Sequence, residues 1–89
     1  MIEQEVVVLN PRGLHARAAA RFVQVASGFR SRVKVIRDGQ TADGKSILGL
    51  LALLARPGMR LLIRVDGVDE GAAIAALAAL VAGRFEEGS

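Results

Sequence analysis

Segments with strand-like and helix-like spacing of apolar residues alternate along this chain, and their order restricts the fold more than any other feature of the sequence. Four strands are predicted, from a β-branched run at residues 5–9, from alternating polarity at residues 31–37 and 60–66, and from the turn that precedes residues 40–42. Three helices are predicted, from apolar residues three and four positions apart at residues 16–26 and 69–82, and from Ser46 as an N-cap before the apolar run at residues 47–54. The predicted order is therefore β-α-β-β-α-β-α.

Short strands with one apolar face suit an antiparallel sheet that buries this face under helices and exposes the other. The sequence therefore predicts an α+β two-layer open-faced sandwich, in which a four-stranded antiparallel sheet is covered by three helices on one face. A chain of 89 residues has room for one shared core, so that residues 1–89 are expected to form a single domain. Residues 84–89 are expected to be a frayed tail.

Individual residues mark the ends of the predicted elements. Asp38-Gly39 is a favoured two-residue turn between the second and third strands. Ser46 is expected to cap the start of the second helix, and Gly83 the end of the third. Gly28 is expected to end the first helix in the left-handed conformation. The first and third helices are expected to bury Ala19, Phe22, Val23, Ala26, Ala73, Ile74, Leu77, Leu80 and Val81.

The composition excludes several classes of protein. The absence of cysteine excludes disulfides and thiolate chemistry, and a single histidine leaves too few nitrogen ligands for a zinc site, so that no metal and no cofactor are expected. The longest apolar runs, at residues 47–55 and 72–82, are shorter than the about 18 residues that a membrane span needs. The acidic start, MIEQE, lacks the features of a secretory signal, and a cytoplasmic protein without membrane insertion is expected.

Nucleic-acid binding is disfavoured by the charge and the aromatic content. The formal net charge is only +3, and Trp and Tyr are absent. Phe22, Phe29 and Phe85 are too far apart in sequence to predict a basic surface with interleaved aromatic rings. The chain is therefore not expected to bind a nucleic acid, although its arginines keep this function as an alternative.

The only histidine, His15, precedes a predicted helix in the segment NPRGLHARA at residues 10–18. Free N–H groups and the helix dipole make such a position suitable for an anion, including a phosphoryl group on residue 15, and favour the neutral, nucleophilic imidazole. Arg17 can donate two hydrogen bonds to phosphate oxygens, and Gly13 allows close approach of the backbone. The position alone favours a surface histidine that caps the helix beside a solvated arginine over a phosphoryl site.

The segment GLHAR at residues 13–17 resembles the active-site segment of HPr proteins, the histidine phosphocarriers of the bacterial phosphotransferase system. Four residues that follow share the resemblance: Ala19, Ala20, Phe22 and Val23. Gly39, the segment GKSI at residues 44–47 and the predicted order of elements also fall where HPr proteins have them. The resemblance extends over essentially the whole chain and implies an HPr-like fold and a phosphoryl carrier without turnover of its own.

In HPr proteins, enzyme I passes a phosphoryl group from phosphoenolpyruvate to the active histidine, which passes it to an EIIA component of a sugar transporter. The resemblance therefore implies that His15 accepts the group through Nδ1 and that Arg17 steadies it. It also implies enzyme I and an EIIA-type acceptor as partners, and we expect a monomer. Family members usually carry proline at the position of Ala18, and alanine is expected to loosen the first turn and to slow transfer at most.

Ser46 resembles the regulatory serine that a dedicated kinase phosphorylates in many HPr proteins. A phosphate with a charge of about −2 at this position would repel an acidic partner. The resemblance thus implies an HPr kinase/phosphorylase and a transcription regulator as further partners. A role in helix capping alone fits Ser46 equally well, and the two roles can coexist.

The predicted helix at residues 47–54 is apolar around its whole circumference, although only one face can contact the sheet. Leu50 and Leu53 are the expected core residues. The resemblance implies that the remaining face meets partner proteins beside the histidine loop, with simple overflow of core residues as the alternative. The expected docking residues are Ala20, Arg21, Ile47, Leu48 and Leu51.

A regulatory interaction module is the main alternative to the phosphoryl carrier. Such a module, HPr-like or from the nitrogen branch of the phosphotransferase system, would act mainly through phosphorylation of Ser46 and binding of a partner. The presence of His15 favours the carrier, because regulators of this kind can lack the active histidine. The sequence does not distinguish a sugar branch from a nitrogen branch.

Overall fold

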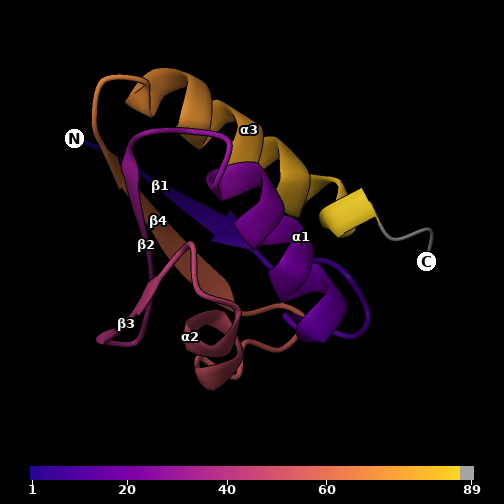
Figure 1. Cartoon of the computed structure of the whole chain (residues 1–89). Coiled ribbons are helices and arrows are strands. Elements are labelled where there is room, and N and C mark those ends of the chain that lie inside the picture. Colours follow the sequence, from indigo (N-terminus) through magenta and orange to yellow (C-terminus); the bar gives the residue numbers. More distant parts are fainter. Residues whose placement is uncertain (87–89) are drawn as a thin grey trace.

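The computed structural model describes residues 1–86, which form an antiparallel sheet with helices on one of its faces (Figure 1). The strands are β1 (Ile2–Val7), β2 (Arg32–Arg37), β3 (Gln40–Asp43) and β4 (Arg60–Asp66). The helices are α1 (Ala16–Ala26), α2 (Ile47–Ala52) and α3 (Glu70–Ala82), followed by the 3₁₀ turn η1 (Arg84–Glu86). The predicted order and the open-faced α+β sandwich are confirmed.

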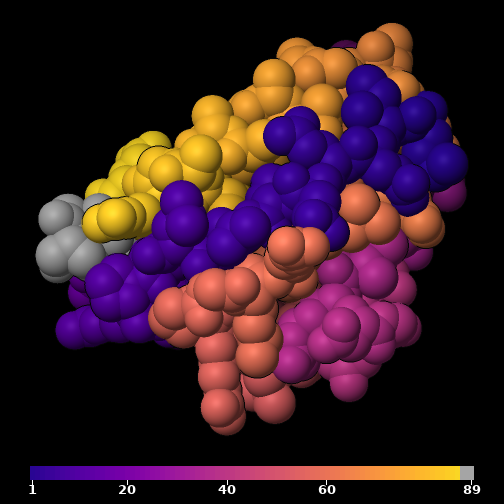
Figure 2. Space-filling model, turned by 180° about the vertical axis from the view of Figure 1, so that it is seen from behind, coloured from indigo at the N-terminus to yellow at the C-terminus, as the bar shows by residue number. Residues whose placement is uncertain are grey.

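The strands pair in the order β1-β4-β2-β3, and every pair is antiparallel. Strand β4 lies between β1 and β2, and its alternating residues Leu61, Ile63 and Val65 are buried under the helices. The residues between them, such as Arg64, belong to the open face of the sheet. Seen from the opposite side, β1 in indigo runs beside α3 in orange and yellow (Figure 2).

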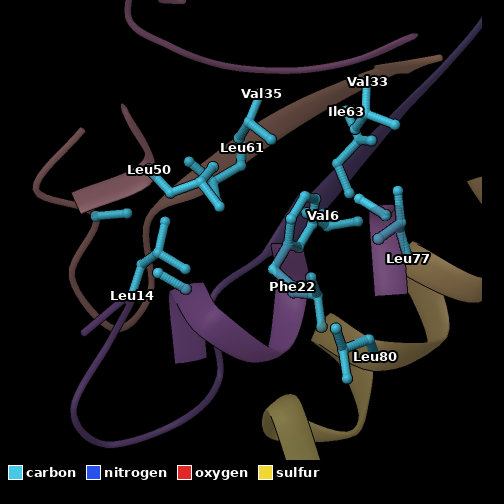
Figure 3. Close-up of a cluster of buried hydrophobic side chains, with 14 of the residues drawn as sticks. Val6, Leu14, Phe22, Val33, Val35, Leu50, Leu61, Ile63, Leu77 and Leu80 are labelled. Atoms are coloured by element: carbon cyan, nitrogen blue, oxygen red, sulfur yellow. The ribbon is translucent and has the colours of Figure 1, made fainter. Parts of the chain in front are cut away.

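The sheet and the helices share one hydrophobic core (Figure 3). Phe22 of α1 lies near Val6 of β1 and Leu80 of α3, whereas Leu14 lies close to Leu50 at the end of the core near α2 (Figure 3). The α3 residues that were expected to face inward are all buried, namely Ala73, Ile74, Leu77, Leu80 and Val81. Helical periodicity therefore predicts the buried face of α3 correctly.

Helix α1 has the predicted bounds, with one change in its buried face. Ala19, Phe22 and Ala26 are buried as predicted, but Val23 is only partly buried. Ala18 is buried as well, with 0% of its surface exposed. The position at which HPr proteins usually carry proline therefore faces the core in this chain.

The predicted bounds of the first strand, residues 5–9, are wrong. Strand β1 begins at Ile2, because Ile2 lies opposite Val65 of β4 and the pairing ends where Val7 meets Arg60. Val8 already belongs to the following loop, where its N–H donates to the carbonyl of Met59 at 2.9 Å. Local β-branched residues suggest the segment, but pairing with a distant strand sets its ends. Smaller shifts occur in β2, which begins at Arg32, and in β3, which ends at Asp43.

The predicted conformation of one glycine and the predicted end of one helix are also wrong. Gly28 is not left-handed; the C-cap residue of α1, Ser27, has a right-handed conformation, and Gly28 donates its N–H to the carbonyl of Val25 at 3.1 Å. Helix α2 ends at Ala52 rather than at residue 54, and Leu54 adopts a left-handed conformation with φ 54°. The predicted caps at Ser46 and Gly83 and the Asp38-Gly39 turn are confirmed.

The expectation of a frayed tail from residue 84 onward is wrong for residues 84–86. These residues form η1, and all three have left-handed backbone conformations. The turn directs Phe85 into the core, where only 2% of its surface is exposed. Burial of a large aromatic side chain offsets the conformational strain of a left-handed phenylalanine. The rest of the predicted tail, residues 87–89, lies outside the described residues.

The start of α3 is tied to the loop before β2 by the carboxylate of Asp69. This carboxylate accepts hydrogen bonds from the backbone N–H groups of Arg30, at 2.8 Å, and Ser31, at 2.9 Å, and from the Ser31 hydroxyl. The Ser31 hydroxyl, followed by the Arg30 N–H, lowers the pKa of Asp69 from 3.8 to about 2. Asp69 therefore stabilises the fold through contacts with a loop 38 or 39 positions earlier in the chain.

Replacing Asp69 with asparagine is expected to lower the urea midpoint of unfolding near neutral pH. Because folding lowers the pKa of Asp69, its stabilisation is complete above the unfolded value of 3.8 and is lost as the pH falls through about 2. The difference between wild type and Asp69→Asn should therefore shrink over this range. Asp38→Asn, in the exposed hairpin turn, removes the same charge and should show no such trend. A difference for Asp69→Asn that stays constant down to about pH 2 would contradict the prediction.

Within residues 1–86, no helix is both long enough and apolar enough to cross a membrane.

Candidate functional site

His15 lies directly before α1 and caps this helix. Its backbone is extended, with φ −83° and ψ −178°, and its Nδ1 accepts a hydrogen bond from the backbone N–H of Arg17 at 3.3 Å. Its carbonyl accepts from the N–H of Ala19 at 2.8 Å. An N–H group directed at Nδ1 requires this nitrogen to be unprotonated. The nitrogen that can act as a nucleophile therefore faces the first turn of α1, where free N–H groups favour an anion.

The loop before His15 is held by buried groups. The side chain of Asn10 is fully buried, and its Nδ2 donates to the carbonyl of Gly13 at 2.6 Å. In return the Gly13 N–H donates to the carbonyl of Asn10 at 3.0 Å. The next residue, Leu14, points into the core (Figure 3). The sequence predicts Asn10 only as a turn residue, whereas its burial shows that it also holds the loop that carries His15.

The segment after α2 packs against the histidine loop. The N–H of Leu14 donates to the carbonyl of Ala55 at 2.9 Å. Gly13 has φ +67°, and a β-carbon on it would lie 2.5 Å from the same carbonyl oxygen. Gly13 is therefore needed for a close approach of two backbone segments, as expected, but the approach is to Ala55 and Arg56 rather than to a ligand.

Exposed arginines lie on both segments that form the site. Arg12 and Arg17 flank His15 in sequence, and no carboxylate in residues 1–86 lies within ion-pair distance of either side chain. The fold adds Arg56, whose Cα would lie 3.1 Å from a β-carbon on Gly13. Sequence reasoning missed Arg56, because only the tertiary contact brings it to the histidine loop. The guanidinium groups give the surroundings of His15 a positive charge that favours phosphate.

Within the same described range, no three His, Asp or Glu side chains are arranged so that they could hold a metal ion.

Ser46 caps α2, as predicted. Its Oγ accepts a hydrogen bond from the N–H of Gly49 at 3.0 Å, and the residue is half-buried. Ser46 lies at the start of α2, whereas the segment that reaches the histidine loop follows the end of this helix. Six helical residues rise by about 9 Å, so that Ser46 and His15 are separate positions on one side of the molecule rather than one cluster.

The predicted docking residues of α2 differ in exposure. Leu50 and Leu53 are buried, as expected for core residues. Leu48 is 80% exposed and Ile47 is 40% exposed, whereas Leu51 is half-buried and contacts the core. Overflow of core residues explains Leu51, but it does not explain a leucine that is almost completely in water.

The remaining docking residues, Ala20 and Arg21, are exposed on α1, which contacts α2. Arg21 forms an ion pair with Glu86 at 3.6 Å, which offsets part of the charge predicted for the rim of the surface. Leu54 was not predicted as a surface residue, yet it is 71% exposed next to Ala55. Its position follows from the early end of α2, which the local sequence does not indicate.

Comparisons with known proteins agree over the whole chain. A family model described as "PTS HPr component phosphorylation site" matches residues 2–83. The chain is 44% identical over 88 residues to phosphocarrier protein HPr of Cupriavidus necator, covering 99% of each sequence. It is 36% identical over 88 residues to phosphocarrier protein NPr of Shewanella violacea, covering 99% of this chain and 97% of that one. The crystal structure of HPr-C-His from Thermoanaerobacter tengcongensis is similar with a TM-score of 0.95, 39% identity and full coverage of both chains.

Proposed function

Because this chain belongs to the HPr family of phosphocarrier proteins of the phosphotransferase system, we propose that His15 accepts a phosphoryl group from phosphorylated enzyme I and passes it to an EIIA component. HPr proteins are carriers and not enzymes with turnover of their own. The observation that carries the proposal is the hydrogen bond from the Arg17 N–H to Nδ1, which supports an unprotonated nucleophile at a helix N-terminus.

In the proposed transfer, the lone pair of Nδ1 forms a bond to phosphorus while the bond between phosphorus and the donor breaks, and the donor keeps that electron pair. The phosphoryl oxygens would take the place of Nδ1 as acceptors for the first-turn N–H groups of α1. The guanidinium of Arg17 would offset the added negative charge. Transfer onward to the EIIA component reverses these steps, so that the protein needs only to position and stabilise charge.

Incubation with enzyme I and phosphoenolpyruvate labelled in the phosphoryl group tests this function. The protein should take up label that is lost in acid and retained in alkali, because a phosphoramidate P–N bond is labile to acid. Addition of an EIIA component should then remove the label. Label that survives acid would point to a phosphoester on serine or threonine and would overturn the proposal for His15.

Ser46 is a second proposed site, for regulatory phosphorylation by an HPr kinase/phosphorylase that uses ATP. Ser46 is only half-buried, which supports access of a kinase to its hydroxyl, although this hydroxyl also caps α2. A phosphate there adds about two negative charges between the docking residues and an acidic partner. Acid-stable label from ATP that is absent in Ser46→Ala supports this role, and equal label in both proteins contradicts it.

We propose a docking surface for enzyme I and EIIA that comprises Ala20, Arg21, Ile47, Leu48, Leu51 and, as an addition from the structure, Leu54. Its support is the exposure of large apolar side chains on α2, which contacts α1, and at Leu54, which directly precedes the segment that packs against the histidine loop. Phosphoryl transfer requires the partner's reacting group to approach Nδ1, so that residues next to the loop are within reach of the partner.

Replacing Leu54 with glycine is expected to change stability and transfer in opposite directions. A leucine at φ 54° is strained, and glycine relieves this strain, so that the free energy of unfolding should rise by up to about 1 kcal/mol. Loss of an exposed apolar contact should raise the KM of enzyme I for this protein about threefold or more. Val68→Ala, at another exposed apolar residue, should change neither quantity. An unchanged KM for Leu54→Gly would remove Leu54 from the docking surface.

The similarity to an NPr protein keeps a nitrogen-branch carrier or regulator as the second candidate function. Parallel transfer assays with sugar-branch and nitrogen-branch enzyme I distinguish the two, because the preferred donor should show the higher kcat/KM.

The expectations of a monomer, of a cytoplasmic location and of no binding to nucleic acid remain predictions. Sedimentation equilibrium tests the first, and binding measurements over a range of salt concentrations test the last.

A further inference from the structure

A hollow of about 320 Å³ lies where the start of β2 meets the loop after β3. Its walls come from residues 30–34 and from Asp43 and Lys45. Lys34 and Asp43 lie directly opposite each other in the β2–β3 pair, and β3 ends at Asp43, whereas β2 begins two residues before Lys34. The volume is at the lower end of the about 300–1,000 Å³ that is usual for small-molecule sites.

The hollow carries an excess of positive charge. Four cationic side chains line it, namely Arg30, Arg32, Lys34 and Lys45. No carboxylate in residues 1–86 forms an ion pair with any of them, whereas Arg60 and Arg64, elsewhere on the sheet, are paired with glutamates of β1.

Three carboxylates near the hollow have other partners, and one of them, Asp66, lies opposite Arg32 in the β2–β4 pair and forms an ion pair with the N-terminal ammonium group at 3.6 Å. The carboxylate of Asp43, the acidic residue in its wall, accepts from the backbone N–H of Lys45 at 2.9 Å. The carboxylate of Asp69 lies behind Ser31 and accepts from Ser31 and Arg30, as described for the start of α3. An added anion would therefore meet cations that have no carboxylate partner in the described part of the chain.

Lys45 is held in place within this wall. Its Nζ donates to the carbonyl of Phe29 at 2.8 Å, and the residue is half-buried. An ammonium group has three donors, so that this bond orients the charge and leaves two N–H groups for a ligand. The side chain of Lys45 is therefore already partly ordered before an anion binds, so that binding loses less conformational entropy.

We propose that this hollow binds a small organic phosphate that carries at least two anionic groups. Guanidinium and ammonium groups are the side chains that bind phosphate most strongly, and several of them around a concave surface fit a compact polyanion. The site is distinct from the phosphoryl site, because His15 precedes α1 and the hollow follows its end. Eleven helical residues rise by about 16 Å, which is too far for one bound phosphate to reach both.

Titration of the ¹⁵N-labelled full chain with pyrophosphate at constant ionic strength, followed by amide chemical shifts, tests the proposal. Saturable shifts are expected at residues 30–34 and 43–45, with a Kd on the order of 1 mM or lower. Inorganic phosphate should bind about fivefold more weakly or worse, because it spans fewer of the cations. The double variant Arg32→Gln/Lys34→Gln should weaken pyrophosphate binding about tenfold or more.

The matched control is Arg60→Gln/Arg84→Gln, which removes the same charge from exposed positions outside the hollow and should leave binding within about twofold of wild type. Equal weakening in both double variants would show that only the net charge of the protein matters, and would overturn the site. Shifts confined to residues 15–17, or shifts that sodium chloride reproduces, would overturn it as well. Equal affinity for phosphate and pyrophosphate would contradict a site for two anionic groups.

Discussion

Replacing His15 with alanine is expected to reduce labelling from enzyme I and phosphoenolpyruvate to background. Nδ1 is the proposed nucleophile, and alanine offers no atom that can accept a phosphoryl group. The variant should still fold, because His15 is only partly buried and its loss removes one capping interaction of about 1 kcal/mol. Circular dichroism and a urea titration check the fold, and the transfer assay measures the label.

Two further variants separate loss of the nucleophile from loss of the helix cap. His15→Asn keeps a good N-cap residue, so that stability should be close to wild type while label stays at background. Ser46→Ala removes the N-cap of α2 at a similar cost of about 1 kcal/mol and should keep full labelling by enzyme I. Label on His15→Asn, or its loss in Ser46→Ala, would contradict His15 as the acceptor.

Replacing Gly13 with alanine is expected to destabilise the protein and to slow transfer together. The left-handed backbone at φ +67° costs alanine about 1 kcal/mol or more. Its β-carbon would also lie 2.5 Å from the carbonyl oxygen of Ala55, and the displacement of packed backbone adds about 1–3 kcal/mol. Because Leu14 and His15 follow directly, the shift should move Nδ1 and lower kcat/KM about tenfold or more. Urea titration and the transfer assay measure the two effects.

Gly58→Ala is the matched control for this prediction. Gly58 also has a left-handed backbone, with φ +87°, but within the described chain no other atom lies within 4 Å of an added β-carbon. Only the conformational cost of about 1 kcal/mol should therefore appear, with transfer unchanged. Equal effects of Gly13→Ala and Gly58→Ala would show that the contact with Ala55 does not position the histidine loop.

Local sequence patterns predict those elements whose bounds depend on local interactions. The bounds of α1 and β4 follow from helical spacing and from strand alternation, and both are confirmed. The N-cap at Ser46 depends only on a serine that directly precedes a helix, so that the local sequence also predicts this cap correctly. The sequence also identifies the histidine at the start of α1, because the cap and the helix are neighbours in the chain.

Features that depend on distant contacts could not be predicted in this way. The bounds of β1 are set by pairing with β4, which is far away in sequence. Phe85 becomes buried because a strained turn folds it back onto the core, and a polar C-terminal segment does not indicate this. The approach of Arg56 to the histidine loop has the same origin, since it depends on the bond between Leu14 and Ala55.

The most direct test of the account is to determine which atom carries the phosphoryl group. NMR of the phosphorylated protein, with ¹⁵N in the imidazole ring, measures the coupling between phosphorus and each ring nitrogen. We expect coupling to Nδ1 of His15, the atom that accepts a hydrogen bond from the N–H of Arg17 at 3.3 Å. Coupling to Nε2, or phosphorus on any other residue, would contradict it.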